Sequence, residues 1–221
     1  MRTLRRLFCT ALLGLAAGAL VPAAAAEPQY LPLPNPQPTD TGDKVEVIEF
    51  FAYYCPHCNA FEPQLADWVR KQGENIVFKR VHVSAGAGAQ AQQRLFYTLD
   101  AMGLLPQYHA KVFEAMHVQR LRLANDEQVI DWAAQAGIDR AKFTETYRSF
   151  GIQARLRRAA GMMDAYDVQY WPMIVVDGKY LTSPSQVGKS MGGGSEAAQQ
   201  AAALQVMDTL VAKARAEKAK Q

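Results

Sequence analysis

The sequence predicts an α/β fold that is interrupted by a helical insertion. An apolar run at 45–54, a helical pattern and a second apolar run at 76–83 together describe a βαβ unit. Residues 90–165 then place apolar side chains at helical spacing. Further on, two short strand-like runs flank Asp177-Gly178, a dipeptide that favours a tight hairpin turn. Strands on both sides of a helical block therefore form one sheet.

The first 26 residues have the composition of a secretory signal peptide. Three arginines within the first six residues precede an apolar run at 7–20, and four alanines end the segment at Ala26. A basic start, an apolar centre and small residues at the end are typical of a cleaved export signal. The apolar run is too short for a good membrane-spanning helix. We therefore expect cleavage after Ala26 and export of the mature chain.

The mature chain of 195 residues carries a balanced charge. The formal charge of +3 comes from the three arginines of the signal segment, because 21 basic and 21 acidic residues remain without them. A neutral chain argues against nucleic acid as the main partner. The length fits one domain with a large insertion, or two closely packed domains.

A proline-rich arm is predicted over residues 27–44. Five prolines between positions 28 and 38 favour an extended backbone. Only a short edge strand near Tyr30–Leu33 has room to form there. The arm leads directly into the first long strand.

The first long strand is expected to be buried on both faces. Side chains alternate between the faces of a strand. One face carries Val45, Val47, Glu49 and Phe51, and the other carries Ile48 and Phe50. Apolar residues on both faces are typical of the middle of a parallel sheet. A carboxylate buried alone on such a face would be costly and would stay protonated, unless it reached water at an edge.

A helix is predicted to begin at or just after Cys55 and to extend to about Lys71. Pro56 suits its first turn, where the missing N–H group would have no partner. Cys55 would then lie at the positive end of the helix, where backbone N–H groups favour a thiolate. The inner face of this helix carries Phe61, Leu65, Trp68 and Val69.

Cys55 and Cys58 are the only cysteines of the mature chain, since Cys9 leaves with the signal. One close pair is too few for a disulfide scaffold, so the pair is placed to react. Thiol–disulfide exchange needs one exposed cysteine of low pKa and a neighbour that resolves the mixed disulfide. We expect Cys55, nearer the helix end, to be the nucleophile and Cys58 to be the resolving thiol.

The two residues between the cysteines favour a redox role. Pro56 restricts the loop, and His57 can place a positive charge near the Cys55 thiolate. A zinc site is one alternative, but zinc usually takes four ligands. The remaining histidines are scattered along the chain, at His82, His109 and His117. An inert disulfide is the other alternative, although so small a loop constrains little of the unfolded chain. We expect no metal.

Capping and stop signals divide the insertion into several helices. Asn125 with Gln128 resembles a capping box, and Asp139 is placed to cap the helix that follows. The apolar stripe of that following helix is expected to carry Phe143, Tyr147 and Phe150. A last run of the insertion is marked by Ile152, Leu156, Ala160 and Met163.

The segment after the hairpin is predicted to be a loop and then one helix. The loop would span Ser183 to Ser195, because three consecutive glycines at its end favour an irregular backbone. The basic residues near the C-terminus suit the end of a final helix. The stripe of that helix carries Leu204, Met207, Leu210 and Val211.

The order of these elements resembles a thioredoxin-like fold with an inserted helical subdomain. The specific match consists of Glu49-Phe50-Phe51-x-Tyr53-Tyr54-Cys55-Pro56-His57-Cys58-x-x-Phe61-Glu62, the helical insert, and a Val176-Asp177-Gly178-Lys179-Tyr180 hairpin after a proline. On these residues the chain resembles the DsbA family of bacterial periplasmic oxidants. The resemblance covers nearly the whole mature chain and is sharpest at Cys-Pro-His-Cys.

The resemblance implies how the chain divides. The expected parts are a signal peptide (1–26), a proline-rich arm (27–44), a first thioredoxin-like part with the active site (45–89), a helical insertion (90–165), and a second thioredoxin-like part (166–221). The second part would hold a cis-proline loop, the hairpin and the C-terminal helix.

The resemblance also implies roles for carboxylates near the cysteines. Glu49 would relay protons to Cys58. Glu62 matches a second acidic position of the family and would modulate that relay, unless it is a solvated helix carboxylate. Both residues lie within seven positions of Cys55 in the sequence.

A substrate-binding segment is implied at Trp171, Pro172 and Met173. Pro172 would be a cis-proline beside the disulfide, where an extended substrate backbone pairs with the chain. The family usually has Val or Thr before this proline, so Trp171 is a departure. An indole offers far more apolar area than either side chain. We expect it to cover Cys55 partly.

The activity implied by the resemblance is donation of the Cys55–Cys58 disulfide to newly exported proteins that contain cysteines. A DsbB-type, quinone-linked membrane protein would reoxidise the pair, in the periplasm, and no dissociable cofactor would be needed. A monomer is expected. The rivals are a disulfide isomerase or reductase of the same fold, and a peptide-binding chaperone without catalysis. Residues 27–44 are too short for the dimerisation domain of a dimeric isomerase.

Overall fold

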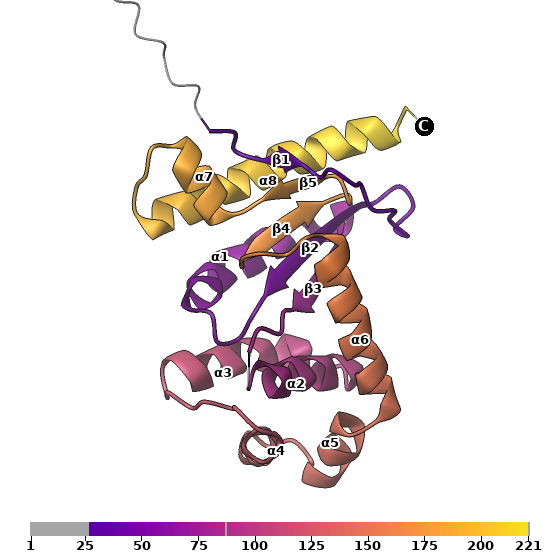
Figure 1. Cartoon of the computed structure of the whole chain (residues 1–221), viewed down its shortest axis with the longest axis vertical. Helices are drawn as coiled ribbons and strands as arrows, with labels where there is room; N and C mark the ends of the chain where they lie inside the picture. The colour runs from indigo at the N-terminus through magenta and orange to yellow at the C-terminus, as the bar shows by residue number, and fades with distance from the viewer. Residues whose placement is uncertain (1–26, 87, 221) are drawn as a thin grey trace, which may run out of the picture.

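A computed structural model describes residues 27–86 and 88–220 of the chain. The predicted signal peptide and its cleavage point therefore lie outside the described residues. Figure 1 shows α7 and α8 at one end of the molecule and α2 to α5 at the other, with the sheet between them. None of the helices in these ranges is long and apolar enough to cross a membrane.

Five strands form one mixed sheet. Its strands are β1 (Leu31–Pro32), β2 (Val45–Phe51), β3 (Ile76–His82), β4 (Met173–Val176) and β5 (Tyr180–Thr182). The spatial order is β1-β5-β4-β2-β3, and only the β2–β3 pair is parallel. All seven residues of β2 are buried, as predicted. The prediction of a parallel sheet holds on one side of β2 only, because β4, its other neighbour, runs antiparallel to it.

Eight α-helices surround this sheet within the described ranges. They are α1 (Pro56–Gln72), α2 (Ala89–Ala101), α3 (Leu105–His117), α4 (Asp126–Gln135), α5 (Arg140–Tyr147), α6 (Phe150–Ala165), α7 (Pro184–Ser190) and α8 (Glu196–Lys218). A short 3-10 turn, Gly73–Asn75, follows α1. Gly73 takes a φ of 53°, a conformation that glycine adopts without the steric cost of a side chain.

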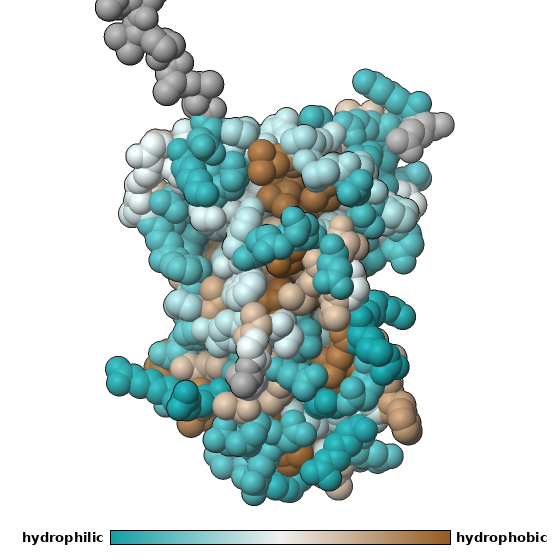
Figure 2. Space-filling model, viewed as in Figure 1, coloured by the Kyte–Doolittle hydropathy of each residue, from teal (hydrophilic) through white to brown (hydrophobic). Residues whose placement is uncertain are grey.

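Apolar side chains are buried on both faces of the sheet. Val45 and Val47 of β2 belong to a cluster that includes Leu65 of α1 and Met207 of α8. Ile48 and Phe50 point to the other face and belong to the larger cluster that continues into the insertion. On the face shown in Figure 2, hydrophilic side chains cover most of the surface and hydrophobic ones show only in smaller patches.

The predicted caps of the insertion are present, but two predicted apolar positions are wrong. The side chain of Asn125 accepts a hydrogen bond from the Gln128 N–H group, and that of Asp139 accepts one from Lys142. Phe143 and Tyr147 are fully buried, whereas Phe150 is 92% exposed. The helix of Phe143 ends at Tyr147, so Phe150 begins α6 on another face. In α6, Ile152 and Leu156 are buried as predicted, but the third buried residue is Ala159, whereas the predicted Ala160 is exposed.

The prediction of a continuous loop from Ser183 to Ser195 is also wrong, because α7 forms within it. The Ser183 hydroxyl accepts a hydrogen bond from the Gln186 N–H group, and Pro184 occupies the first turn. Val187 is completely buried in the cluster that α8 shares with the sheet. The short helix α7 is therefore stabilised by packing of its Val187 side chain against α8.

The proline-rich arm forms the predicted edge strand, β1, which pairs with β5 of the hairpin. Asp177 and Gly178 both have positive φ angles, 52° and 63°, which is the geometry of the predicted tight turn. The N–H group of Gln37 donates to the Gly178 carbonyl at 2.8 Å. A Cβ atom at position 178 would lie 2.1 Å from the Gln37 carbonyl oxygen, so the arm and the turn fit together only with glycine.

Candidate active site

Cys55 caps the N-terminus of α1. The N–H group of Cys58 donates to its Sγ atom at 3.3 Å, and Pro56 occupies the first turn. Both cysteines are free thiols. The Cys58 thiol, the N–H groups of Cys58 and His57 and the His57 charge lower the pKa of Cys55 to about 6, against the opposing effect of burial. The residue predicted to be the nucleophile is therefore the one held as a thiolate.

Cys58 lies one turn inside the helix and is completely buried. Burial raises its pKa, and the neighbouring Cys55 and Glu49 raise it further. Cys58 is thus kept as a neutral thiol beside an ionised one. This contrast supports the predicted division into an attacked sulfur and a resolving sulfur.

His57 lies on the surface between the two cysteines and pairs with a residue that the sequence did not suggest. Its Nδ1 atom is 2.7 Å from Oε1 of Glu196, the first residue of α8. The hydrogen bond that His57 donates to Glu196 raises the pKa of His57, while partial burial opposes the change. Glu196 lies 139 positions away in the chain, so no local pattern links the two.

The predicted substrate segment borders the sulfur. The Trp171–Pro172 peptide bond is cis, and the carbonyl oxygen of Trp171 lies 3.7 Å from Sγ of Cys55. The indole ring stands edge-on to the ring of Tyr54, with 6.1 Å between the ring centres. Met173 is fully buried opposite Phe50, in the same apolar cluster as both cysteines.

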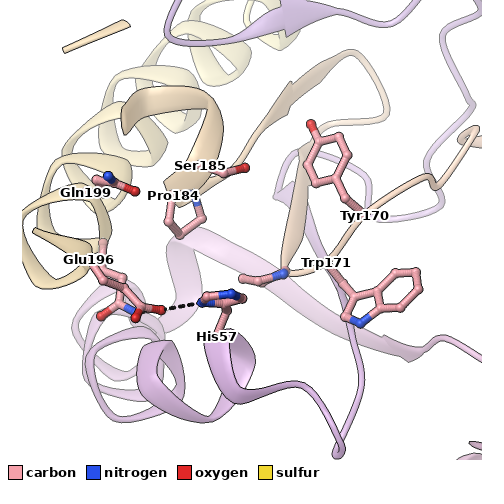
Figure 3. Close-up of a pocket in the computed structure, with 9 residues that line it drawn as sticks. His57, Tyr170, Trp171, Pro184, Ser185, Glu196 and Gln199 are labelled. Carbon is pink, nitrogen blue, oxygen red and sulfur yellow. Dashed lines mark hydrogen bonds and ion pairs between the residues drawn. The ribbon is translucent and has the colours of Figure 1, made fainter. Parts of the chain in front are cut away.

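A pocket of about 280 Å³ opens beside this segment. Figure 3 shows the His57–Glu196 pair and the Trp171 indole at opposite sides of it. Its lining consists of His57, Tyr170, Trp171, Pro172, Pro184, Ser185, Glu196, Gln199 and Gln200. One side of the pocket is formed by aromatic rings and prolines, from the loop before β4 and from α7. The other side is formed by the amides and the carboxylate of α8. An extended peptide that passes Trp171 and Pro172 can place a side chain there.

Two carboxylates are buried beneath the cysteines, and Arg80 binds both. In the parallel pair β2–β3, Glu49 stands opposite Arg80, whose Nε atom donates to it at 3.0 Å. Arg80 also donates to both oxygens of Glu62 at 2.9 Å. Glu62 is 9% exposed, so the alternative of a solvated carboxylate is wrong. Burial raises the pKa of Glu49 to about 8 despite Arg80.

The three scattered histidines meet at Tyr53, two residues before Cys55. The Tyr53 N–H group donates to Nε2 of His82 at 3.1 Å, and its hydroxyl lies 2.8 Å from Nδ1 of His109. Nε2 of His117 lies 2.7 Å from the Tyr53 carbonyl oxygen. These histidines therefore hold the loop that carries the nucleophile.

Buried His82 gives a testable dependence of stability on pH. Burial lowers its pKa to about 3, whereas an unfolded histidine has a pKa near 6.5. Between these values the unfolded chain binds the extra proton, so stability falls as the pH falls, by about 1.4 kcal/mol per unit. Substitution His82→Gln should reduce the loss of unfolding free energy between pH 7 and pH 4 by up to about 3 kcal/mol, measured by urea denaturation.

The exposed His57 offers the matched control for that measurement. Substitution His57→Gln also removes one histidine, but the pKa of His57 is raised and its ring is on the surface. Because a raised native pKa adds stability as the pH falls, this variant should lose at least as much stability in acid as the wild type. An unchanged acid loss in His82→Gln would show that His82 does not contribute to it.

Trp171→Thr is expected to speed thiol exchange and to lower the pKa of Cys55 further. The indole lies against Tyr54, and the backbone of residue 171 faces the sulfur. Removing the ring admits water, and burial is what opposes ionisation of Cys55. The measurements are the oxidation rate of a small thiol and the thiolate absorbance as a function of pH. If both are unchanged, the ring does not cover the sulfur.

Comparisons with known proteins agree with this geometry. Residues 71–205 match the model of the DSBA-like thioredoxin domain, and residues 39–95 match that of thioredoxin. The chain is 39% identical over 215 residues to the thiol:disulfide interchange protein DsbA of Bordetella pertussis, covering 96% of this chain and 98% of that protein. It is 36% identical to the protein of that name from Pseudomonas aeruginosa, covering 96% and 98%.

A solved structure is similar over the same range. The crystal structure of Pseudomonas aeruginosa DsbA superposes with a TM-score of 0.76 at 35% sequence identity. The match covers 87% of this chain and 95% of that one. The sheet, the insertion and the helix that begins at the cysteine pair thus recur together in a protein of similar sequence.

Proposed function

The chain belongs to the DsbA family of thiol:disulfide interchange proteins, and on this basis we propose that Cys55 and Cys58 carry the disulfide that it donates. It is a thiol:disulfide oxidoreductase of oxidative protein folding. The observation that carries the residue assignment is the position of Cys55 at the N-terminus of α1, with its lowered pKa. A stable thiolate makes the reduced form favourable and the disulfide a ready oxidant.

The proposed reaction has two exchange steps. A substrate thiolate attacks Sγ of Cys55, the Cys55–Cys58 bond breaks, and its electron pair leaves on Cys58, which takes up a proton. A second substrate thiolate then attacks the substrate sulfur of the mixed disulfide, and Cys55 leaves as a thiolate. Two substrate thiols are oxidised to a disulfide, and the cysteine pair is reduced. The low pKa of Cys55 favours its departure.

Glu49 is the proposed source of the proton for Cys58. It is a buried carboxyl whose pKa of about 8 lets it gain or lose a proton near neutral pH. Its charge also opposes ionisation of Cys58, so the two groups interact. Arg80 binds the Glu49 carboxylate and balances it when the proton has left. Glu62 shares Arg80 and thereby modulates that balance.

The setting and partners are also proposals. The signal-like segment that ends at Ala26 supports export to the periplasm. Substrates would be newly exported proteins that contain cysteines, held with their backbone beside Trp171 and Pro172. A DsbB-type, quinone-linked membrane protein would reoxidise the pair, the chain would act as a monomer, and the disulfide itself would replace any dissociable cofactor.

Equilibration with a glutathione redox series tests the proposed direction of the reaction. A pair that is reduced even in strongly oxidising mixtures is an oxidant, and we expect this result. A pair that stays oxidised in reducing mixtures would indicate a reductase. Refolding of a reduced substrate protein gives the second readout, because replacement of both cysteines should abolish disulfide formation. Unchanged assistance by that double variant would indicate a chaperone.

A further inference from the structure

We propose that Glu196 is a positioning residue that holds His57 away from Cys55 and so weakens the oxidising strength of the pair. The proposal rests on the proposed function of the Cys55–Cys58 pair. Its first observation is the contact itself, 2.7 Å between Nδ1 of His57 and Oε1 of Glu196. Figure 3 shows this pair at the edge of the pocket beside Pro184, with the Trp171 indole on the opposite side.

The carboxylate is held in place from behind. Oε1 of Glu196 accepts a second hydrogen bond from Nε2 of Gln200, one turn further along α8, at 3.3 Å. Gln200 is 3% exposed, and its own Oε1 accepts from Gln64 of α1 at 2.9 Å. Ser195 caps α8 immediately before Glu196. A contact between two exposed side chains is usually weak, but here one partner is fixed by a buried amide.

The charge of the pair decides the sign of the effect. A protonated His57 alone would place a full positive charge beside the Cys55 thiolate and stabilise the reduced form. With Glu196 bound, the imidazolium and the carboxylate form a neutral pair, whose field at Cys55 is weaker. The Nδ1 proton is also directed to Glu196 and not to the sulfur. Reduction of the disulfide is therefore less favourable than it would be without Glu196.

The surroundings contain few competing charges. The titratable groups that share the pocket or the helix end with His57 are Cys55, Cys58, Glu196 and Tyr170, and the buried Glu49 also interacts with Cys55. Glu196 and the Cys55 thiolate both raise the pKa of His57, and the phenol of Tyr170 has its own pKa raised by burial. In the acid and neutral range, Tyr170 is uncharged. The response to pH there thus belongs to Cys55, His57 and Glu49, whose pKa of about 8 is also affected by the Cys55 charge.

The test replaces the carboxylate by its amide, Glu196→Gln. The thiolate absorbance of Cys55 should titrate at lower pH, because His57 then faces it without a counter-charge. The equilibrium with glutathione should shift toward the reduced protein by roughly threefold to tenfold, which corresponds to about half a pKa unit to one unit. The His57 ring, followed by NMR, should titrate at lower pH than in the wild type.

Two further variants test whether Glu196 acts on Cys55 through His57. Glu145→Gln removes the same charge from an exposed position of α5 and should leave all three readouts unchanged. In a His57→Ala background, Glu196→Gln should have little effect, because the residue acts through His57. An equal effect in that background would overturn the positioning role, as would an unchanged or raised pKa of Cys55 in Glu196→Gln. Failure of the wild type to oxidise a substrate would instead count against the proposed function, since the titrations do not depend on it.

Discussion

Cys58→Ala is expected to accumulate mixed disulfides with a substrate protein, whereas Cys55→Ala accumulates almost none. When the substrate is supplied with a disulfide, the Cys55 thiolate attacks it, and no second thiol is present to release the product. Cys55 has a pKa of about 6, while Cys58 is buried and its pKa is raised. The thiolate fraction at pH 7 then differs by at least about a hundredfold. Non-reducing electrophoresis measures the covalent complex.

The double variant Cys55→Ala/Cys58→Ala provides the background for this experiment, since it has no thiol in the mature chain. Addition of a reductant should release the complex formed by Cys58→Ala. More complex in Cys55→Ala than in Cys58→Ala would reverse the two roles. Equal amounts would mean that the helix end does not distinguish the two sulfurs.

The second large effect concerns folding: reduction should stabilise the protein increasingly as the pH rises from 6 to 9. The native pKa of Cys55 is about 6, below its ordinary value of 9.0. A lowered native pKa adds stability at pH values above that pKa. The added stability reaches its full value once the unfolded thiol also ionises, and it is lost again as the pH falls to 6. The full shift corresponds to at most about 4 kcal/mol, and solvent near the sulfur reduces this value.

Chemical denaturation of the reduced and oxidised forms at several pH values measures this difference. The oxidised form has no ionisable thiol at position 55, so its unfolding free energy should follow the pH dependence of the remaining groups alone. Reduced Cys55→Ser is the matched control, because a hydroxyl does not ionise in this range, and it should lose the gain. A difference between reduced and oxidised protein that does not change between pH 6 and pH 9 would contradict the expectation.

Local patterns predicted most of the fold and the chemical centre of the site. The strand that leads into Cys55, the helix start at Pro56 and the turn at Asp177 each depend on residues close together in the sequence. Alternation, helix capping and turn preferences act over such distances. Where these signals agreed with one another, as at Asn125 and Asp139, the structure confirmed them.

The parts that were missed depend on pairing between distant segments. Arg80 is one of two adjacent basic residues in β3, and only the register of β2 with β3 places it opposite Glu49. If the register of β2 with β3 were known, the sequence alone would suggest the Glu49–Arg80 ion pair. Glu196 reaches His57 because α8 crosses α1, which no local pattern describes. Phe150 fits a helical stripe by spacing, but the helix ends before it.

The three histidines around Tyr53 limit how far this fold can be treated as modular. Two of them, His109 and His117, belong to α3 and hold the hydroxyl and the carbonyl of a residue in the loop of the nucleophile. Cutting α2 to α6 out of the chain would remove both of these partners, together with Phe96 and Phe113, whose rings pack against Tyr53. A smaller oxidant could therefore not be obtained by trimming the insertion alone, because the insertion supplies part of the frame of the reactive loop. Engineering that shortens this chain must first replace Tyr53.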